Sequence, residues 1–152
     1  VGPIAIDAHG ALYAVGGQAA PGSSSWTYDV LGGFTSDGAT AWSATTDEGI
    51  TGGPVLDDHD HVYVTTSAGV DPGSSMHLVA FGTDGQLLWQ RALPPSGTTP
   101  SYWSLLGAAG ALTIAVDGRV HAYSSGGAKP PSCAPWPTPR GDIGQRASAL
   151  GG

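Results

Sequence analysis

The stretch LDDHDH holds the densest group of side chains that could bind a metal ion or take part in acid–base chemistry. Carboxylate oxygens and imidazole nitrogens are the ligands that Ca²⁺ and Zn²⁺ take in proteins. A metal site also needs ligands that converge from other parts of the fold. An Asp in a turn has a simpler role, because it accepts hydrogen bonds from local backbone N–H groups. The sequence therefore favours a hairpin turn, and we predict no metal site. The candidate ligands are Asp57, Asp58, His59, Asp60 and His61.

The remaining reactive side chains do not form a recognisable catalytic group. His77 and His121 each precede an apolar or aromatic stretch, which predicts half-buried strand positions. A nucleophilic serine needs a paired base and an orienting acid, and no serine lies in a Gly-x-Ser-x-Gly motif. Cys133 is the only cysteine, so no intrachain disulfide can form. The Arg-Gly-Asp triplet at 140–142 is interpreted as a chance match. We predict no catalytic residue and no bound cofactor.

Two stretches of the chain repeat one another and provide the frame for these side chains. GPIAIDAHGALYAV begins at Gly2 and GPVLDDHDHVYVTT begins at Gly53, with Tyr13 and Tyr63 50 positions apart. Each copy is apolar, then small or polar, then apolar or aromatic, which is the pattern of a β-hairpin. The candidate ligands around Asp57 therefore occupy the predicted turn.

A third copy can be aligned in two registers. In one register, LLGAAGALTIAV places Leu112 100 positions after Leu12. In the other, the interval from Asp117 to Tyr123 repeats the interval from Asp7 to Tyr13. The sequence does not choose between these registers.

A second hairpin follows the first one in each unit. FTSDGATAW and FGTDGQLLW match through Phe, Asp-Gly and Trp at an offset of 47 positions. Asp-Gly between strands indicates a tight turn, because Gly adopts a positive φ without strain. We expect the tryptophan to pack against the neighbouring unit, where burial of its ring stabilises the contact by about 2 kcal/mol. The residues of this structural repeat are Phe34, Gly38 and Trp42, then Phe81, Gly85 and Trp89, then Tyr123, Gly127 and Trp136.

Four short strands in each unit predict the blades of a β-propeller, which repeat every ~40 to 50 residues. Helical repeats of similar length would need apolar residues at every third or fourth position, and the chain lacks that period. We expect an all-β, propeller-type array of about three four-stranded blades with a C-terminal closing segment. The chain begins within a strand pattern and a ring needs about four to eight blades, so we expect it to be part of a larger propeller. The expected units are roughly 1–47, 48–94 and 95–139, with the closing segment at 134–152.

These motifs together resemble the PQQ-like repeat of quinoprotein-type β-propellers. The shared pattern is Gly-Pro, an AHG or DG turn, LYAV or VYV, aromatic-x-x-Asp-Gly and Trp. The terminal WPTPRGDIGQR resembles a Trp-Pro-x-x-Arg-x-Asp-x-x-x-Arg segment that flanks such arrays. We expect its Trp136 to pack like Trp42 and Trp89 and to cover the last strand edge, whose unpaired groups could otherwise pair with another chain. The resemblance implies an extracytoplasmic location, in the periplasm, at the cell surface or outside the cell.

Composition excludes two classes of protein. The chain carries 5 Lys and Arg residues and a net charge of −7, whereas a nucleic-acid-binding protein needs a basic patch. It contains no run of about 18 apolar residues, so no membrane-spanning helix is expected. Its 25 glycines and 40% hydrophobic residues fit many short strands joined by turns.

We expect a non-catalytic scaffold or protein-interaction module that binds through face loops or blade edges. Candidate face loops are GQAAPGSSS (17–25) and SAGVDPGSS (67–75), which occur at equivalent places. One alternative is the C-terminal part of a PQQ-dependent oxidoreductase, which would bind PQQ and Ca²⁺. Another is an assembly subunit that pairs through open blade edges. The expected partners are proteins, either the remaining blades of a parent chain or identical copies.

Overall fold

The computed structural model describes residues 4–19, 26–69, 71–95, 97, 103–106, 111–116 and 119–125, and every regular element in these ranges is a β-strand. The prediction of an all-β chain is therefore confirmed. The described part contains no helix that is long and apolar enough to span a membrane.

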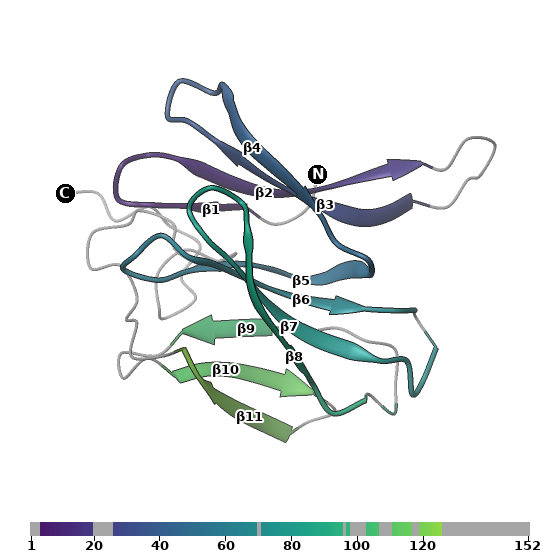
Figure 1. Ribbon diagram of the computed structural model, residues 1–152. Coiled ribbons are helices and arrows are strands. Elements are labelled where there is room, and N and C mark those ends of the chain that lie inside the picture. Colours follow the sequence, from purple (N-terminus) through teal and green to yellow (C-terminus); the bar gives the residue numbers. More distant parts are fainter. Residues whose placement is uncertain are drawn as a thin grey trace.

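The strands form three antiparallel sheets in which neighbours along the chain are also neighbours in the sheet (Figure 1). The first sheet consists of β1 (Ile4–Ile6), β2 (Leu12–Ala19), β3 (Trp26–Phe34) and β4 (Thr40–Thr45), in that order. The second sheet consists of β5 (Gly49–Leu56), β6 (Val62–Ser67), β7 (Met76–Phe81) and β8 (Leu87–Ala92), also in chain order. The third sheet has the order β11-β10-β9 and consists of β9 (Trp103–Leu106), β10 (Ala111–Val116) and β11 (Arg119–Ser124).

The two Asp-Gly motifs lie in tight turns where the sequence predicts hairpins. Gly38 (φ 87°) lies between β3 and β4, and Gly85 (φ 79°) lies between β7 and β8. A residue with a Cβ is strained at such φ values, whereas Gly is not. The turns close through backbone hydrogen bonds from Gly38 N to Thr35 O (2.9 Å) and from Gly85 N to Gly82 O (3.0 Å).

Strand register decides which alignment of the third copy is correct. Leu12 pairs with Phe34, and Leu112 pairs with Tyr123 in the same way. The structure therefore selects the register that places Leu112 100 positions after Leu12. The alternative register is wrong, because residue 117 follows the second strand of its sheet, whereas Asp7 follows the first strand.

The second sheet lies between the other two (Figure 1). Its β5 lies against β1, β2 and β3 of the first sheet and against β9 of the third. We call the face of a sheet that points toward the next sheet along the chain its downstream face, and the opposite face its upstream face. The upstream face of the first sheet is therefore the one that points away from the second sheet. Both faces of the second sheet are covered in this arrangement.

Two apolar cores join the sheets. The first core packs the downstream face of the first sheet, including Tyr13, Val15 and Leu31, on the upstream face of the second. The second core packs the downstream face of the second sheet, including Tyr63 and Leu78, on the third sheet. The first core also contains Ala5, Ile50, Leu56, Val62, Val64, Val79 and Phe81. The second also contains Val55, Met76, Ala80, Leu93, Leu112, Ile114 and Val116.

Burial falls from the middle of the array to its outer strands. All six residues of β6 are buried, because successive side chains of a strand point to opposite faces and both faces of this sheet are covered. The outer strands β4 and β8 are exposed or partly buried throughout. The core therefore lies along the inner strands.

The predicted closing segment falls outside the described residues. Gly127, Trp136 and the whole of 134–152 belong to that part of the chain, so their packing stays a prediction. The described strands of the three sheets fall within residues 4–45, 49–92 and 103–124.

Candidate functional site

The candidate ligand Asp57 is fully buried at the end of β5 and is bound by its own turn. Its Oδ1 accepts hydrogen bonds from the backbone N–H groups of His59 (2.8 Å) and His61 (2.9 Å). Its Oδ2 accepts one from the Tyr63 hydroxyl (2.7 Å) and lies 2.9 Å from Nδ1 of His61. These four partners match the roughly four acceptor positions of a carboxylate, so this network stabilises the turn.

The first sheet contains the same network at its own first turn. Asp7 is buried, and its Oδ1 accepts hydrogen bonds from the N–H groups of His9 (2.8 Å) and Ala11 (2.9 Å). The Tyr13 hydroxyl donates to Oδ2 of Asp7 (3.1 Å). The six-residue interval from Asp to Tyr thus has a physical cause. Sequence reasoning noticed this interval but missed the role of Tyr13 and Tyr63 as donors.

The acidic partners also act on the two tyrosines. Burial raises the pKa of Tyr13, and the charge of Asp7 and its hydrogen bond raise it further. Burial likewise raises the pKa of Tyr63, followed by its hydrogen bond to Asp57 and the charge of that carboxylate. Both phenols therefore stay protonated as donors throughout the neutral range.

The other members of the predicted cluster lie on the surface of the turn. Asp58 Oδ1 lies 2.9 Å from Nδ1 of His59, and ligand atoms of Asp57, Asp58 and His59 come within 4.8 Å of one another. All three belong to one turn, and Asp57 already has partners from within it. Within the described residues, the group that could hold an ion thus consists of side chains from this one turn, and the absence of a metal site stays a prediction.

Asp60 occupies the position that glycine takes in the first turn. Its φ is 59°, while the equivalent Gly10 has a φ of 83°. Asp tolerates this left-handed conformation better than most residues. Burial raises the pKa of Asp60, with a further increase from the charge of Asp7, so the turns of the first and second sheets influence each other.

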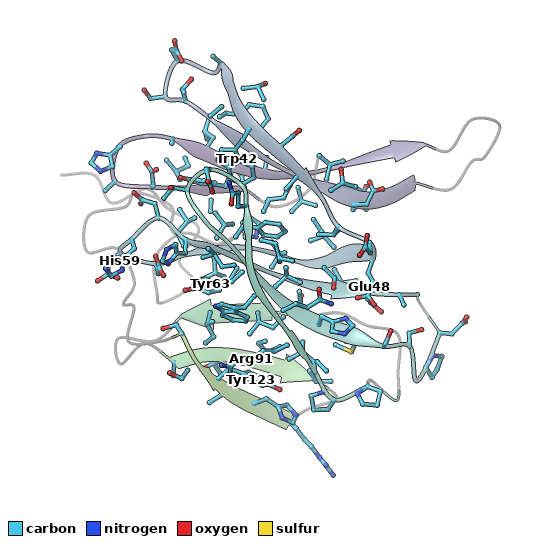
Figure 2. All side chains as sticks on the ribbon, in the orientation of Figure 1. Trp42, Glu48, His59, Tyr63, Arg91 and Tyr123 are labelled. Atoms are coloured by element: carbon cyan, nitrogen blue, oxygen red, sulfur yellow. The ribbon has the colours of Figure 1, made fainter. Side chains whose placement is uncertain are left out.

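Trp42 lies between the first and second sheets (Figure 2). It pairs with Gly33 across β3 and β4, and its ring centroid lies 6.1 Å from that of Tyr13. A Cβ added at Gly85, in the second sheet, would lie 2.5 Å from the Trp42 ring. The indole of Trp42 thus packs against the turn between β7 and β8, at a position where glycine leaves room for the ring.

Trp89 takes the equivalent place one sheet later. It pairs with Ala80 across β7 and β8, and its ring centroid lies 5.8 Å from that of Tyr63. The Arg91 guanidinium lies 5.3 Å from the Trp89 ring centroid, a cation–π contact. Trp89 and Tyr123 both pack against the core between the second and third sheets.

Glu48 lies directly before β5, at the end of the array opposite to His59, and contacts β6, β7 and the loop between them (Figure 2). Its Oε2 accepts hydrogen bonds from Thr66 Oγ1 and lies near Nδ1 of His77, each at 2.8 Å, and its Oε1 accepts one from Ser75 Oγ at 3.2 Å. Burial raises the pKa of Glu48, but these hydrogen bonds and the charge of His77 outweigh it, so the pKa is lowered.

His77 and His121 lie in strands, where the sequence predicts them. His77 is a partly buried residue of β7. His121 is partly buried in β11, opposite Ile114.

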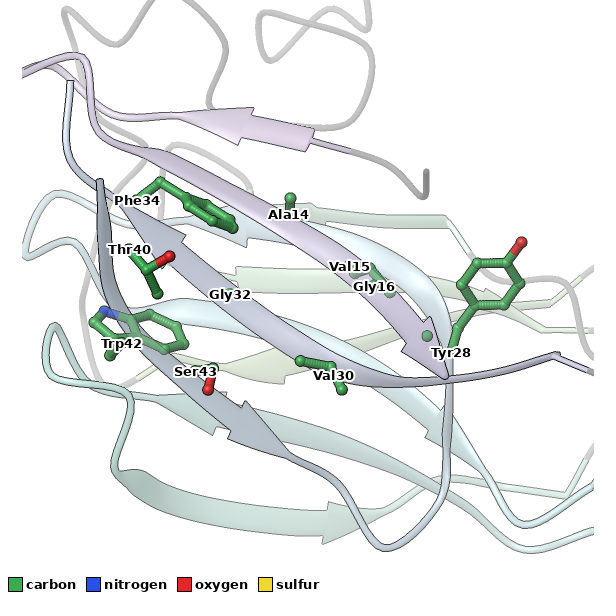
Figure 3. A pocket seen from close by; sticks show the side chains of 11 residues that line it. Ala14, Val15, Gly16, Tyr28, Val30, Gly32, Phe34, Thr40, Trp42 and Ser43 are labelled. Carbon is green, nitrogen blue, oxygen red and sulfur yellow. The ribbon is translucent and has the colours of Figure 1, made fainter. Parts of the chain in front are cut away.

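A groove of about 660 Å³ lies on the upstream face of the first sheet (Figure 3). Small residues form its floor: Ala14 pairs with Gly32, and Gly16 follows on the same face of β2. Tyr28 stands at one end and Phe34 at the other (Figure 3). None of the described residues that line the groove carries a charge.

The groove exists because this face differs from its equivalent on the second sheet. Ala14 and Gly32 correspond in register to Val64 and Val79, which are buried in the core between the first two sheets. Sequence reasoning did not find the groove. The available signal was the pair of small-residue runs AVGG and LGGF, where the second copy has larger side chains.

The predicted face loops receive no support from these contacts. Residues 20–25 of the first loop lie outside the described part. In the second loop, Ser74 N donates to Asp71 O (3.1 Å) and Ser67 Oγ donates to Gly69 O (2.7 Å), which forms local turns. A binding role for either loop stays a prediction. Cys133 and the triplet at 140–142 also lie outside the described residues.

A scan against protein-family models matched none of them, and a search of curated proteins returned no match. The resemblance to PQQ-like repeats therefore stays a prediction that rests on the motifs alone.

Proposed function

We propose that this chain is an arc of a β-propeller, similar to PQQ-like repeat arrays, and that it acts as a non-catalytic scaffold that binds protein. The proposal rests on one observation. The first sheet has an open, uncharged groove on its upstream face, whereas the second sheet uses its own upstream face to pack on the first sheet. A partner would bind there, on the face of a sheet, rather than at the loops that the sequence first indicated.

The arrangement of the sheets supports the propeller part of the proposal. Each four-stranded sheet is a simple meander, and the sheets follow one another in chain order. The first strand of the second sheet, β5, lies against β1 and β9, the first strands of its two neighbours. Propeller blades have this order, with the first strand of each blade nearest the central channel.

The chemistry of the groove supports the protein-binding part. Exposed apolar surface bounded by polar residues is typical of interaction sites, and aromatic side chains contribute most of the binding energy at many interfaces. The groove offers Phe34 and the 44% exposed Tyr28, with Trp42 at its border. The groove can therefore accept apolar side chains of a partner.

A photo-cross-linking residue introduced at Ser43 tests this function, because Ser43 lines the groove. We expect the purified chain, incubated with an extract of the cells that produce it, to form a covalent adduct with a polypeptide. The adduct should disappear when Gly16→Arg is added, since a Cβ at Gly16 meets only Val30 O at 4.0 Å and the new side chain fills the groove.

The control places the cross-linker at Leu88, an exposed strand residue (48% exposed) of the second sheet. Adduct formation at Leu88 should not depend on Gly16. If Ser43 yields no adduct, or yields one that Gly16→Arg leaves unchanged, the groove is not a protein-binding surface and the proposal is overturned.

A further inference from the structure

We propose that the groove on the upstream face of the first sheet binds the downstream face of the third sheet of a second copy of this chain. Two copies joined head to tail in this way would bring their six described sheets into one ring. The inference rests on the proposed propeller arc and deepens it, because it names the partner and the surface that the partner uses.

The second sheet shows how an upstream face is covered in this protein. Val62, Val64 and Phe81 are buried beneath the first sheet. The indole of Trp42 reaches the turn at Gly85, where a Cβ would lie 2.5 Å from the ring. The occupant of this face is therefore the Trp-bearing downstream face of another sheet.

The first sheet repeats the main features of that binding face. Phe34 corresponds to Phe81 in strand register, and Gly38 corresponds to Gly85 with nearly the same φ, 87° against 79°. A Cβ added at Gly38 would meet none of the described residues within 4 Å. Among these residues, the position that receives an indole in the second sheet is thus open in the first.

Among the described residues, the third sheet carries the complementary exposed face on β10 and β11. Leu112 and Ile114 point to the second sheet and are buried, so the alternate residues of β10 and β11 form the downstream face. Ala115 pairs with Val120 on that face, and Val120 is 70% exposed. By sequence, the tryptophan equivalent to Trp42 and Trp89 is Trp136, which lies outside the described residues.

The second sheet separates these two open faces within one chain (Figure 1). One copy therefore cannot cover its own groove with its third sheet, whereas a second copy can. Contacts between unlike faces close into a ring when the rotation between copies closes, and the six described sheets of two copies fall within the roughly four to eight of known propellers.

The lining of the groove, rather than the net charge of the chain, fits an apolar partner. Each copy has a net charge of −7, so long-range electrostatics oppose association of two copies. The groove lining is uncharged, and the paired residues Ala115 and Val120 are apolar. Association therefore depends on burial of apolar surface, which high salt should strengthen by screening the repulsion.

Sedimentation velocity of the chain and two variants tests the proposal. We expect the wild-type chain, of 15.1 kDa, to sediment at twice its own mass. Gly16→Arg, which fills the groove, and Val120→Arg, which places a charge on the opposite face, should each return the chain to its single mass. Two matched controls should leave the doubled mass unchanged. The first control is Gly49→Arg, because a Cβ added at Gly49 would lie 3.7 Å from Ser67 O, an ordinary contact. The second control is Leu88→Arg, which replaces an exposed apolar residue.

A mixture of the two interface variants provides the sharper test. Gly16→Arg keeps an intact downstream face and Val120→Arg keeps an intact groove, so one of the two contacts can still form. The mixture should therefore regain the doubled mass that neither variant shows alone. A wild-type chain at its single mass, or a doubled mass that survives Gly16→Arg, would overturn the inference. A mixture that stays at the single mass would overturn the head-to-tail arrangement.

The two proposals fail in different ways. If the wild-type chain has its single mass while Ser43 still gives a groove-dependent adduct with another polypeptide, the second copy is wrong and the protein-binding function stands. If Ser43 gives no groove-dependent adduct at all, both are overturned.

Discussion

The first and second sheets have the same strand order and the same turn chemistry. Among the described residues, however, the second sheet is covered on both faces and the first on one. In the second sheet, Val64 and Val79 fill the upstream face and are buried by the first sheet. In the first sheet, Ala14 and Gly32 occupy the same register positions and leave a groove. The comparison teaches that the hydrogen-bonding frame of a sheet is independent of how its faces are packed, because side chains alone determine the packing.

The largest expected effect concerns the buried aspartates of the two sheets. Asp57→Ala should reduce the free energy of unfolding by about 4 kcal/mol, because it leaves the Tyr63 hydroxyl and two backbone N–H groups without their acceptor. Asp7→Ala should cost less, about 3 kcal/mol, since Asp7 lacks the extra contact that His61 makes with Asp57. Urea denaturation followed by tryptophan fluorescence measures both values. An equal or smaller loss for Asp57→Ala would contradict the comparison.

The next effect distinguishes the two turn glycines. Gly38→Ala should cost about 1 kcal/mol, because only the positive φ opposes a Cβ there. Gly85→Ala should cost about 3 kcal/mol, since the Cβ also collides with the Trp42 ring. Both are measured by denaturation under the same conditions. The double variant Gly85→Ala with Trp42→Ala provides the control, because removal of the ring should leave only the φ penalty for Gly85→Ala.

A stabilising substitution follows from comparing Val15 with Thr65. These residues pair with Leu31 and Leu78 in equivalent registers, and both are buried. The hydroxyl of Thr65 has no hydrogen-bond partner among the described residues. Thr65→Val should therefore raise the free energy of unfolding by about 1 kcal/mol, because an unpaired buried hydroxyl is removed without change of shape. A decrease in stability would show that the hydroxyl has a partner.

The smallest effect is the pH dependence that Glu48 contributes to the second sheet. Because its pKa is lowered in the folded chain, its stabilising contribution is present above its ordinary value of 4.5 and is lost as the pH falls through the folded-state pKa. Glu48→Gln should remove this contribution, worth about 1 kcal/mol at a partly open site. Free energies of unfolding measured between neutral and acidic pH should thus fall less steeply in the variant. A parallel decline in both proteins would exclude the role of Glu48.

Much of the strand arrangement could be predicted from local patterns. The Asp-Gly turns and the repeated Phe and Trp indicated the hairpins, because a positive φ favours Gly. The hairpin turn around Asp57 was also predicted, from its repeat partner Asp7, and the pairing of β5 with β6 confirms that turn. The absence of a metal there stays a prediction. What local patterns could not provide was the hydrogen bond from Tyr63 to Asp57, because it depends on how β5 and β6 pair.

By itself, the sequence determined an all-β chain built from repeated units, with turns at Asp-Gly and at the buried aspartates. These features follow from the alternation of side chains and from the backbone preferences of single residues. Only the tertiary structure decided the register of the third unit, the position of Trp42 against the neighbouring sheet, and the open groove above Ala14 and Gly32. Each of these depends on which faces of distant strands meet, and the same alternating pattern is compatible with a face that is covered and a face that is free.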